Sequence, residues 1–186
     1  VWRGPRPPLR IPRQRDGRGR LRQVALGRRR HEAPEGVRTF LGPGQAGYTD
    51  TFALATDGTA SSPERWARAL FEDVAGLQGQ FIWRALLGLR LHRQASPQYV
   101  AGWRIAEHHD DRIRLEAHSW MLTGHLIVQV DDGQVSLTTV LRYRRPPAAW
   151  LWPPLAAVHR RLAPGLLRDA HRILQARPAE PEAPDN

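Results

Sequence analysis

"RIRLEAHSWMLTGHLIVQV", residues 112–130, is the stretch that decides the fold. Apolar residues occupy odd-numbered positions before "SWMLTG" and even-numbered positions after it. Such alternation with a period of two is typical of a strand with one buried face. An antiparallel hairpin with an even-numbered loop requires this reversal of parity, so the stretch predicts two paired strands.

A second hairpin follows in "VQVDDGQVSL", residues 128–137, where the pair Asp132-Gly133 signals a two-residue turn. This turn predicts four facing pairs: Val130 with Val135, Val128 with Leu137, Leu126 with Thr139, and Gly124 with Leu141. For the preceding hairpin we expect three pairs: Ile113 with Val130, Leu115 with Val128, and Ala117 with Leu126. Both hairpins then place their apolar residues on one face of the sheet.

The segments before these hairpins predict a strand, two short helices and a further strand. They are "YTDTFALA" (48–55), "SSPERWARALFEDV" (61–74), "FIWRALLGLRL" (81–91) and "YVAGWRIAE" (99–107). The first helix has a good start, because Ser62 can cap it, Pro63 suits its first position and Glu64 lies in its first turn.

A long helix is expected in "PPLAAVHRRLAPGLLRDAHRILQ", residues 153–175. Prolines 153 and 154 can start it, and Pro164 should kink or divide it near residues 160–161. Its apolar stripe covers the inner face of the sheet and consists of Leu155, Val158, Leu162, Leu166, Ala170 and Ile173. The sequence therefore predicts an α+β fold in which an antiparallel meander sheet grips a long C-terminal helix, with two short helices after the first strand.

This order of elements resembles the START-like helix-grip superfamily, also called the SRPBCC or polyketide-cyclase/Bet-v-1-like grouping. More narrowly, it resembles an uncharacterised bacterial family of that grouping, a domain of unknown function. The resemblance covers roughly Tyr48 to Gln175, and it rests on "YTDTFAL", on residues 112–130 and on the region of Trp152, Pro154 and His159. It implies a cavity between sheet and C-terminal helix that holds an apolar ligand, and in some members cyclisation, dehydration or hydrolysis there. Larger members have six or seven strands, so we look for an irregular edge strand in residues 91–97.

Charge divides the chain into two parts. Residues 1–36 hold 11 arginines against 3 acidic residues, and residues 37–186 hold 17 arginines against 15 acidic residues. We expect a disordered Arg/Pro/Gly-rich extension over 1–36, the helix-grip domain over 37–176 and a disordered acidic tail over 177–186. Two alternatives remain for the extension: a basic arm that neutralises phosphates, or upstream DNA translated from a misassigned start, as Val1 suggests. Since the domain itself is nearly neutral, we expect no specific nucleic-acid partner.

Composition excludes several classes of protein. The chain has no cysteine, which excludes disulfides and thiolate metal sites. No apolar run reaches the roughly 18 residues of a membrane-spanning helix. Residues 1–23 lack the hydrophobic segment of a secretory signal. We therefore expect a cytoplasmic protein without a transmembrane segment.

The expected inner face of the sheet is apolar, and hydroxyl groups interrupt it in only a few places, as is typical of small-molecule pockets. His159 lies on the apolar stripe of the C-terminal helix, where packing, ligand contact and catalysis are all open interpretations. The residues that we expect to contact a ligand are Trp103, Leu115, Ser119, Met121, Leu122, Leu126, Thr139, Tyr143 and His159.

The turn "SWMLTG" carries three large apolar side chains. A two-residue turn made of Met121 and Leu122 is chemically poor, because tight hairpin turns favour Gly, Asn or Asp. We therefore expect a wider connection from Trp120 to Thr123. Exposed apolar side chains need cover, and we favour a lid that the turn forms over the groove between sheet and helix. The alternatives are contact with another subunit or a membrane surface, and packing against the second short helix.

Metal and cofactor sites are not expected. With the register above, His118 and His125 face each other on the outer surface of the sheet, but a functional metal site needs a third ligand and ordered surroundings. The run "HHDD", residues 108–111, is typical of a hydrated turn. No Ser/His/Asp spacing, phosphate loop or GxGxxG pattern is present.

Three functions therefore remain open. The first is a binding module for a hydrophobic small molecule, such as a lipid, a polyketide or an isoprenoid-like compound. The second is an enzyme of the same cavity, a cyclase or hydratase that uses His159 or Tyr143 as acid or base, with Glu107 as the nearest carboxylate. The third is a structural domain whose core is filled by Trp103 and Tyr143. We expect binding rather than catalysis.

Overall fold

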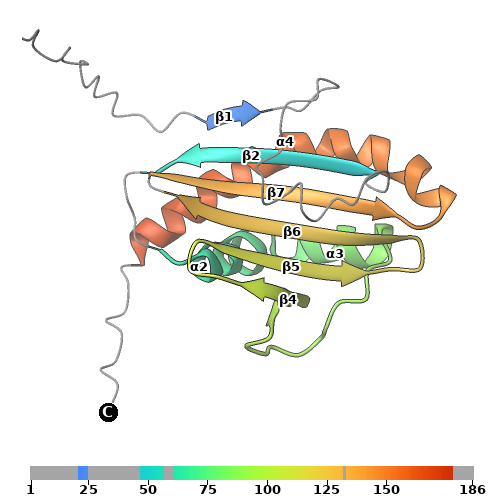
Figure 1. The fold of residues 1–186 in the computed structure, drawn as a ribbon, viewed down its shortest axis with the longest axis horizontal. Helices are drawn as coiled ribbons and strands as arrows, with labels where there is room; N and C mark the ends of the chain where they lie inside the picture. The colour runs from blue at the N-terminus through green and yellow to red at the C-terminus, as the bar shows by residue number, and fades with distance from the viewer. Residues whose placement is uncertain (1–20, 25–46, 57–60, 132, 178–186) are drawn as a thin grey trace, which may run out of the picture.

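The fold is α+β, as expected. The computed structural model describes residues 21–24, 47–56, 61–131 and 133–177. Seven antiparallel strands form one sheet in the order β1-β2-β7-β6-β5-β4-β3, and the helices cover one face of it (Figure 1). The strands are β1 (Leu21–Val24), β2 (Tyr48–Ala55), β3 (Tyr99–Val100), β4 (Trp103–His108), β5 (Arg112–His118), β6 (Leu122–Asp131) and β7 (Gln134–Tyr143).

The hairpin of β6 and β7 has the expected register. Val130 faces Val135, Val128 faces Leu137, Leu126 faces Thr139, and Gly124 faces Leu141. Gly133 adopts a φ of 75°, which suits a tight hairpin turn, whereas Asp132 lies outside the described residues. The inner face of these two strands is therefore the apolar surface that the alternation predicted.

The expected register of the β5–β6 hairpin is wrong by two residues. The observed pairs are Ile113 with Val128, Leu115 with Leu126, and Ala117 with Gly124. Because side chains alternate between faces with a period of two, this shift leaves the same residues on the inner face.

The cause of the shift is the turn between β5 and β6, which is tighter than the connection that we expected. Ser119 and Leu122 flank Trp120 and Met121, and the Ser119 amide donates to the Leu122 carbonyl at 2.8 Å. The Ser119 hydroxyl accepts hydrogen bonds from the amides of Met121 and Leu122, at 3.3 and 3.1 Å. A serine side chain can stabilise a turn in this way, so this turn forms without Gly, Asn or Asp at its centre.

The single strand expected over 99–107 is a hairpin of β3 and β4. Ala101 and Gly102 form its turn with φ angles of 50° and 85°. In the described part of the chain, Ala101 is the only non-glycine residue with a positive φ. The segment 91–97, in which we looked for an edge strand, contains none, and the edge of the sheet is instead the short strand β3, which begins at Tyr99.

The first helical layer consists of α2 (Pro63–Arg68), its π-helical continuation η1 (Ala69–Val74), α3 (Gly76–Phe81) and a second π-helical segment η2 (Ile82–Leu86). Ser62 caps α2 by accepting a hydrogen bond from the Arg65 amide, as predicted. The second helix begins at Gly76 rather than at Phe81. No residue of α3 or η2 is buried, although this segment carries several large apolar side chains.

The second helical layer is α4 (Pro146–Ala176), one continuous helix of 31 residues. It begins seven residues before Pro153, at prolines that suit a first turn, and Pro164 does not divide it. Neither α4 nor another helix in the described ranges is long and apolar enough to cross a membrane. The buried stripe shares only Ala170 with the stripe that we expected and consists largely of small residues: Ala148, Trp152, Ala156, Ala163, Leu167, Ala170 and Leu174.

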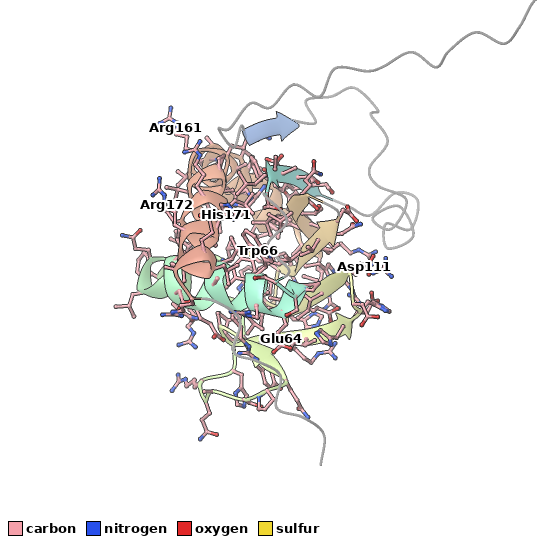
Figure 2. All side chains as sticks on the ribbon, turned by 90° about the vertical axis from the view of Figure 1, so that its left-hand side faces the viewer. Glu64, Trp66, Asp111, Arg161, His171 and Arg172 are labelled. Carbon is pink, nitrogen blue, oxygen red and sulfur yellow. The ribbon has the colours of Figure 1, made fainter. Side chains whose placement is uncertain are left out.

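The two helical layers cover different strands. Helix α4 packs on β2 and β7, whereas α2 packs on β5 and β6. Helix α4 also packs on α2 and η1, where the rings of Trp66 and His171 stack with centroids 5.8 Å apart (Figure 2). The two layers therefore meet where Trp66 stacks on His171. Elsewhere they diverge and leave part of the inner face of β6 and β7 uncovered by either helix.

Strand β1 lies within the segment 1–36. Its four residues pair with β2, from Leu21 opposite Leu54 to Val24 opposite Thr51. This part of the segment thus has regular structure. The rest of 1–36 and residues 178–186 lie outside the described residues, and the domain boundaries stay predictions.

The β3–β4 turn provides a test of the fold. Replacing Ala101 by glycine should raise the free energy of unfolding by about 1 kcal/mol, because glycine adopts a positive φ without steric cost. Replacing Gly102 by alanine should lower it by about 2 kcal/mol or more, because a Cβ there would lie 2.6 Å from the His92 carbonyl oxygen at a φ of 85°. Urea unfolding measures both, and equal effects of the two substitutions would contradict this geometry.

Candidate ligand cavity

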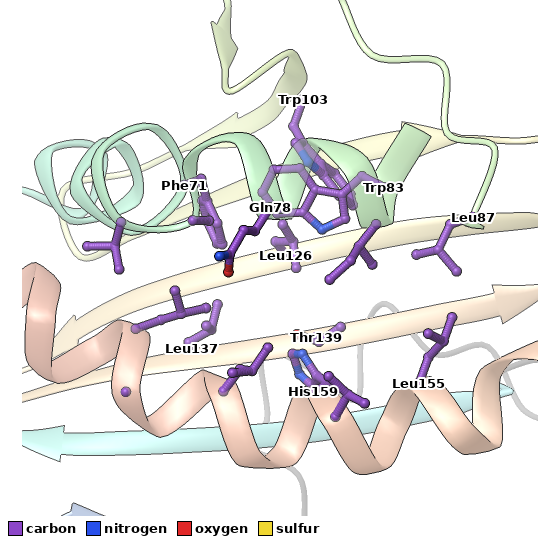
Figure 3. A pocket seen from close by; sticks show the side chains of 18 of the residues that line it. Phe71, Gln78, Trp83, Leu87, Trp103, Leu126, Leu137, Thr139, Leu155 and His159 are labelled. Carbon is purple, nitrogen blue, oxygen red and sulfur yellow. The ribbon is translucent and has the colours of Figure 1, made fainter. Parts of the chain in front are cut away.

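A cavity of about 330 Å³ lies between the inner face of the sheet and the two helical layers (Figure 3). Its floor is formed by β6 and β7, and its walls are formed by η1, α3 and η2 on one side and α4 on the other. The lining is mostly apolar and comprises Phe71, Val74, Ala75, Gln78, Gly79, Ile82, Trp83, Leu87, Trp103, Leu126, Leu137, Thr139, Leu141, Trp152, Leu155, Val158, His159, Leu162, Gly165, Leu166 and Asp169.

One end of the cavity is aromatic. The rings of Phe71 and Trp83 meet edge to face with centroids 6.0 Å apart, and those of Trp83 and Trp103 do so at 5.6 Å. Gln78, an exposed residue of the lining, extends from α3 toward α4 (Figure 3). Aromatic side chains provide large apolar contact areas with few rotatable bonds, so this end can hold a flat apolar group.

The wall formed by α4 carries His159. Its ring lies 5.7 Å from the ring of Phe52, 6.0 Å from that of Trp152 and 6.4 Å from that of Tyr48, measured between centroids. Burial lowers the pKa of His159, and Arg160 lowers it further, whereas Asp50 opposes them. The imidazole is therefore neutral at neutral pH, and each of its nitrogens can either donate or accept a hydrogen bond, depending on the tautomer.

A buried carboxylate lies close to this histidine. Asp50 of β2 accepts hydrogen bonds from the Tyr48 hydroxyl at 2.7 Å and from Arg160 Nε at 3.2 Å. Burial and Asp50 together raise the pKa of Tyr48, so the phenol stays protonated and donates. Sequence reasoning missed Asp50. It lies at one of the alternating positions of "YTDTFALA" that face the core, where a polar residue is unusual and points to a specific role.

Four of the nine expected ligand residues line the cavity: Trp103, Leu126, Thr139 and His159. The other five lie elsewhere. Leu115 is buried in the core, Ser119, Met121 and Leu122 form the β5–β6 turn, and Tyr143 lies against Gly47. Burial raises the pKa of Tyr143. Whether any of the nine contacts a ligand stays a prediction.

The β5–β6 turn does not line the cavity. Met121 and Leu122 are buried in the hydrophobic core, and only Trp120, 55% exposed, reaches the surface. A Cβ on Gly88, just after the second helix, would lie 3.8 Å from the Trp120 ring. The turn therefore does not form the lid over this cavity that we favoured, and its position agrees best with the alternative of packing near the second helix.

His118 and His125 do not face each other, because His118 pairs with Thr123 and His125 with Glu116. Both contact the Glu116 carboxylate, at 2.6 and 3.4 Å. Burial, with help from the neighbouring arginines, lowers the pKa of His125 to about 4, so its contact with Glu116 is not an ion pair at neutral pH. Among the described residues, no three His, Asp or Glu side chains are placed to hold a metal ion.

Glu107, the carboxylate that we expected nearest to His159, does not line the cavity. Arg114 Nη2 binds its carboxylate at 2.7 Å and thereby joins it to the Glu116 cluster. A register shift between Ile105 and Glu107 accompanies this arrangement. The inward carboxylate near His159 is therefore Asp50 instead.

Comparisons with known proteins give a distant structural match. No family model matches the chain, and no curated protein sequence matches it. The match is to the crystal structure of BexL, a di-domain ARO/CYC protein from the BE-7585A biosynthetic pathway, with 16% sequence identity and a TM-score of 0.36. The alignment covers 77% of this chain and 55% of that one, so the chain spans about half the length of that protein.

Asp50 should contribute more to stability than an exposed carboxylate does. Replacing it by asparagine should lower the free energy of unfolding by about 1–2 kcal/mol, because the charge that holds Arg160 and Tyr48 is lost in a buried position. The matched control is Asp73→Asn, which removes a more exposed partner of Arg177 and should cost less than about 0.5 kcal/mol. Urea unfolding at pH 7 measures both, and equal costs would contradict the role of Asp50.

His125 should make stability depend on pH. The unfolded chain binds a proton at this residue near pH 6.5, whereas the folded chain binds it near pH 4. Acidification therefore favours unfolding between these values. His125→Asn should reduce the stability lost between pH 7 and pH 5 by about 1–2 kcal/mol. The two proteins should differ by a constant amount between pH 7 and 8, and identical acid profiles would show that His125 titrates normally.

Proposed function

We propose that this chain binds a hydrophobic small molecule in the cavity between its sheet and its helices. The observation that carries the proposal is the cavity itself, about 330 Å³ in volume and walled mostly by apolar side chains. Pockets for small molecules measure about 300–1,000 Å³ and combine apolar walls with a few polar groups. A single organic molecule of modest size matches this space.

The cavity is also accessible from solvent. Val158 and Leu162 of α4 line it, yet they are 46% and 49% exposed. On the opposite wall, α3 and η2 contain no buried residue. Since large apolar side chains at a rim can contact an entering apolar ligand, the space between α3 and α4 is a suitable entrance.

The filled-core alternative has less support, because Trp103 and the helices leave the volume open and Tyr143 lies away from it. Catalysis by His159 or Tyr143 also has less support. A general base is usually oriented by a second group, but Asp50 bonds to Tyr48 and Arg160, and no hydrogen bond between it and His159 is found among the described residues. We therefore favour binding over chemistry.

Filling part of the cavity should weaken ligand binding without damage to the fold. Gly165 of α4 lines the cavity, and a Cβ built on it meets no atom within 4 Å. Gly165→Leu should weaken the binding of the neutral dye Nile red by about tenfold or more, since the new side chain occupies the space of the ligand. The free energy of unfolding should rise by about 1 kcal/mol, because leucine favours a helix more than glycine does.

The control is Ala157→Leu, which adds a comparable side chain at an exposed position of the same helix. Nile red fluorescence titrations of the three proteins give the affinities, and urea unfolding gives the stabilities. Equal dye affinity in the wild type and in a stable Gly165→Leu variant would place the dye outside the cavity and contradict the proposal.

A further inference from the structure

Four of the residues that line the cavity have a buried polar atom without a hydrogen-bond partner in the described structure. These atoms are Trp103 Nε1, Thr139 Oγ1, Trp152 Nε1 and His159 Nε2. Most buried polar atoms in proteins are hydrogen-bonded, so each exception needs a physical explanation. All four belong to the wall of one cavity, which suggests that what occupies the cavity provides the missing partner.

Three of the four belong to one region, which we call the polar end: Thr139, Trp152 and His159. The His159 ring contacts Tyr48 and Phe52, the inward residues of β2 on either side of Asp50. Asp50 pairs directly with Thr139 of β7, so His159 lies over the part of the sheet that carries Thr139 (Figure 3). Trp152, two helical turns before His159 on α4, is the third member, with its ring centroid 6.0 Å from that of His159.

The nearest carboxylate, Asp50, does not provide the hydrogen-bond partners that the polar end lacks. Asp50 accepts from the Tyr48 hydroxyl and from Arg160 Nε, and no hydrogen bond joins it to Thr139 or His159 among the described residues. Arg160 likewise forms an ion pair with Asp50. Since no arginine lines the cavity, its described wall offers no cation to an anionic ligand.

The hydrogen-bonding chemistry of the polar end favours one kind of partner. The indole N–H of Trp152 can only donate, whereas the Thr139 hydroxyl and a neutral imidazole nitrogen can donate or accept. An acceptor oxygen therefore matches each of the three groups. Opposite the polar end lie the rings of Phe71, Trp83 and Trp103, which suit a flat apolar body.

We infer that the ligand is an uncharged ring compound with an acceptor oxygen, such as a ketone or quinone, whose oxygen lies at the polar end and whose rings lie among Phe71, Trp83 and Trp103. This inference rests on the proposed function and narrows it. A pure hydrocarbon would leave the polar atoms unpaired, and a carboxylate such as that of a fatty acid would be desolvated without a counter-charge. Both classes are therefore disfavoured.

Three compounds with the same ring frame test the inference: fluorene, 9-fluorenone and fluorene-9-carboxylate. Their affinities for the full chain are measured by displacement of Nile red. We expect 9-fluorenone to bind at least about tenfold more tightly than either of the others, the factor that one satisfied buried hydrogen bond supplies. Thr139→Val, which keeps the shape and removes the hydroxyl, should reduce this preference about threefold or more while the affinity for fluorene stays unchanged.

The matched control is Thr138→Val. Thr138 is the neighbouring residue on β7, but its hydroxyl bonds to that of Thr51 and it does not line the cavity. Its replacement should leave the preference for 9-fluorenone intact. His159→Phe is the second variant, and it should also reduce the preference.

The outcomes separate the two proposals. Equal affinities for fluorene and 9-fluorenone, or tighter binding of the carboxylate, would overturn the inference and leave the proposed function standing. The same holds if the chain binds Nile red but none of the three compounds displaces it, or if both variants keep the full preference. Failure of Nile red and of all three compounds to bind would overturn both proposals.

Discussion

The width of the sheet is the constraint on which the rest of this structure depends. Strands lie about 4.8 Å apart, so seven of them span about 29 Å, whereas a helix with its side chains covers only about 10–12 Å. One helix cannot cover such a face. Here α4 covers β2 and β7, and α2 covers β5 and β6. The cavity lies where these two layers diverge, and its floor of Leu126, Leu137, Thr139 and Leu141 comes from the two strands in the middle.

Much of the fold follows from local patterns in the sequence. Alternation with a period of two predicted the inner face of β4 to β7, and the Asp132-Gly133 pair predicted the register of the β6–β7 hairpin. The β5–β6 register was missed because it depends on the Ser119 hydroxyl, which stabilises a tight turn whose central residues do not favour one. The β3–β4 turn was missed for a similar reason, since alanine rarely adopts the positive φ that Ala101 has.

The candidate site was accessible to sequence reasoning only in part. Thr139 and His159 were found because each is a polar residue at a position where the periodicity requires an apolar one. Asp50 obeys the same rule and was overlooked in a short strand whose burial was not yet known. The apolar residues of α3 and η2 could not be identified as cavity walls from the sequence alone, because whether Trp83 or Ile82 packs on the sheet or stands away from it depends on the distance between helical layers. That distance is a property of the whole fold.

The open volume has a consequence for how such a chain changes through evolution. Unfilled space in a protein interior lowers stability, by about 24 cal/mol for each cubic ångström in large-to-small substitutions. Almost any substitution that enlarges a residue lining the cavity would therefore increase stability, but it would also reduce the volume that the ligand needs. Under both pressures, the total side-chain volume of the residues that line the cavity is constrained more strongly than the identity of each residue. Among descendants of this chain, growth at Leu155 or Ile82 would persist only where a neighbouring wall residue became smaller.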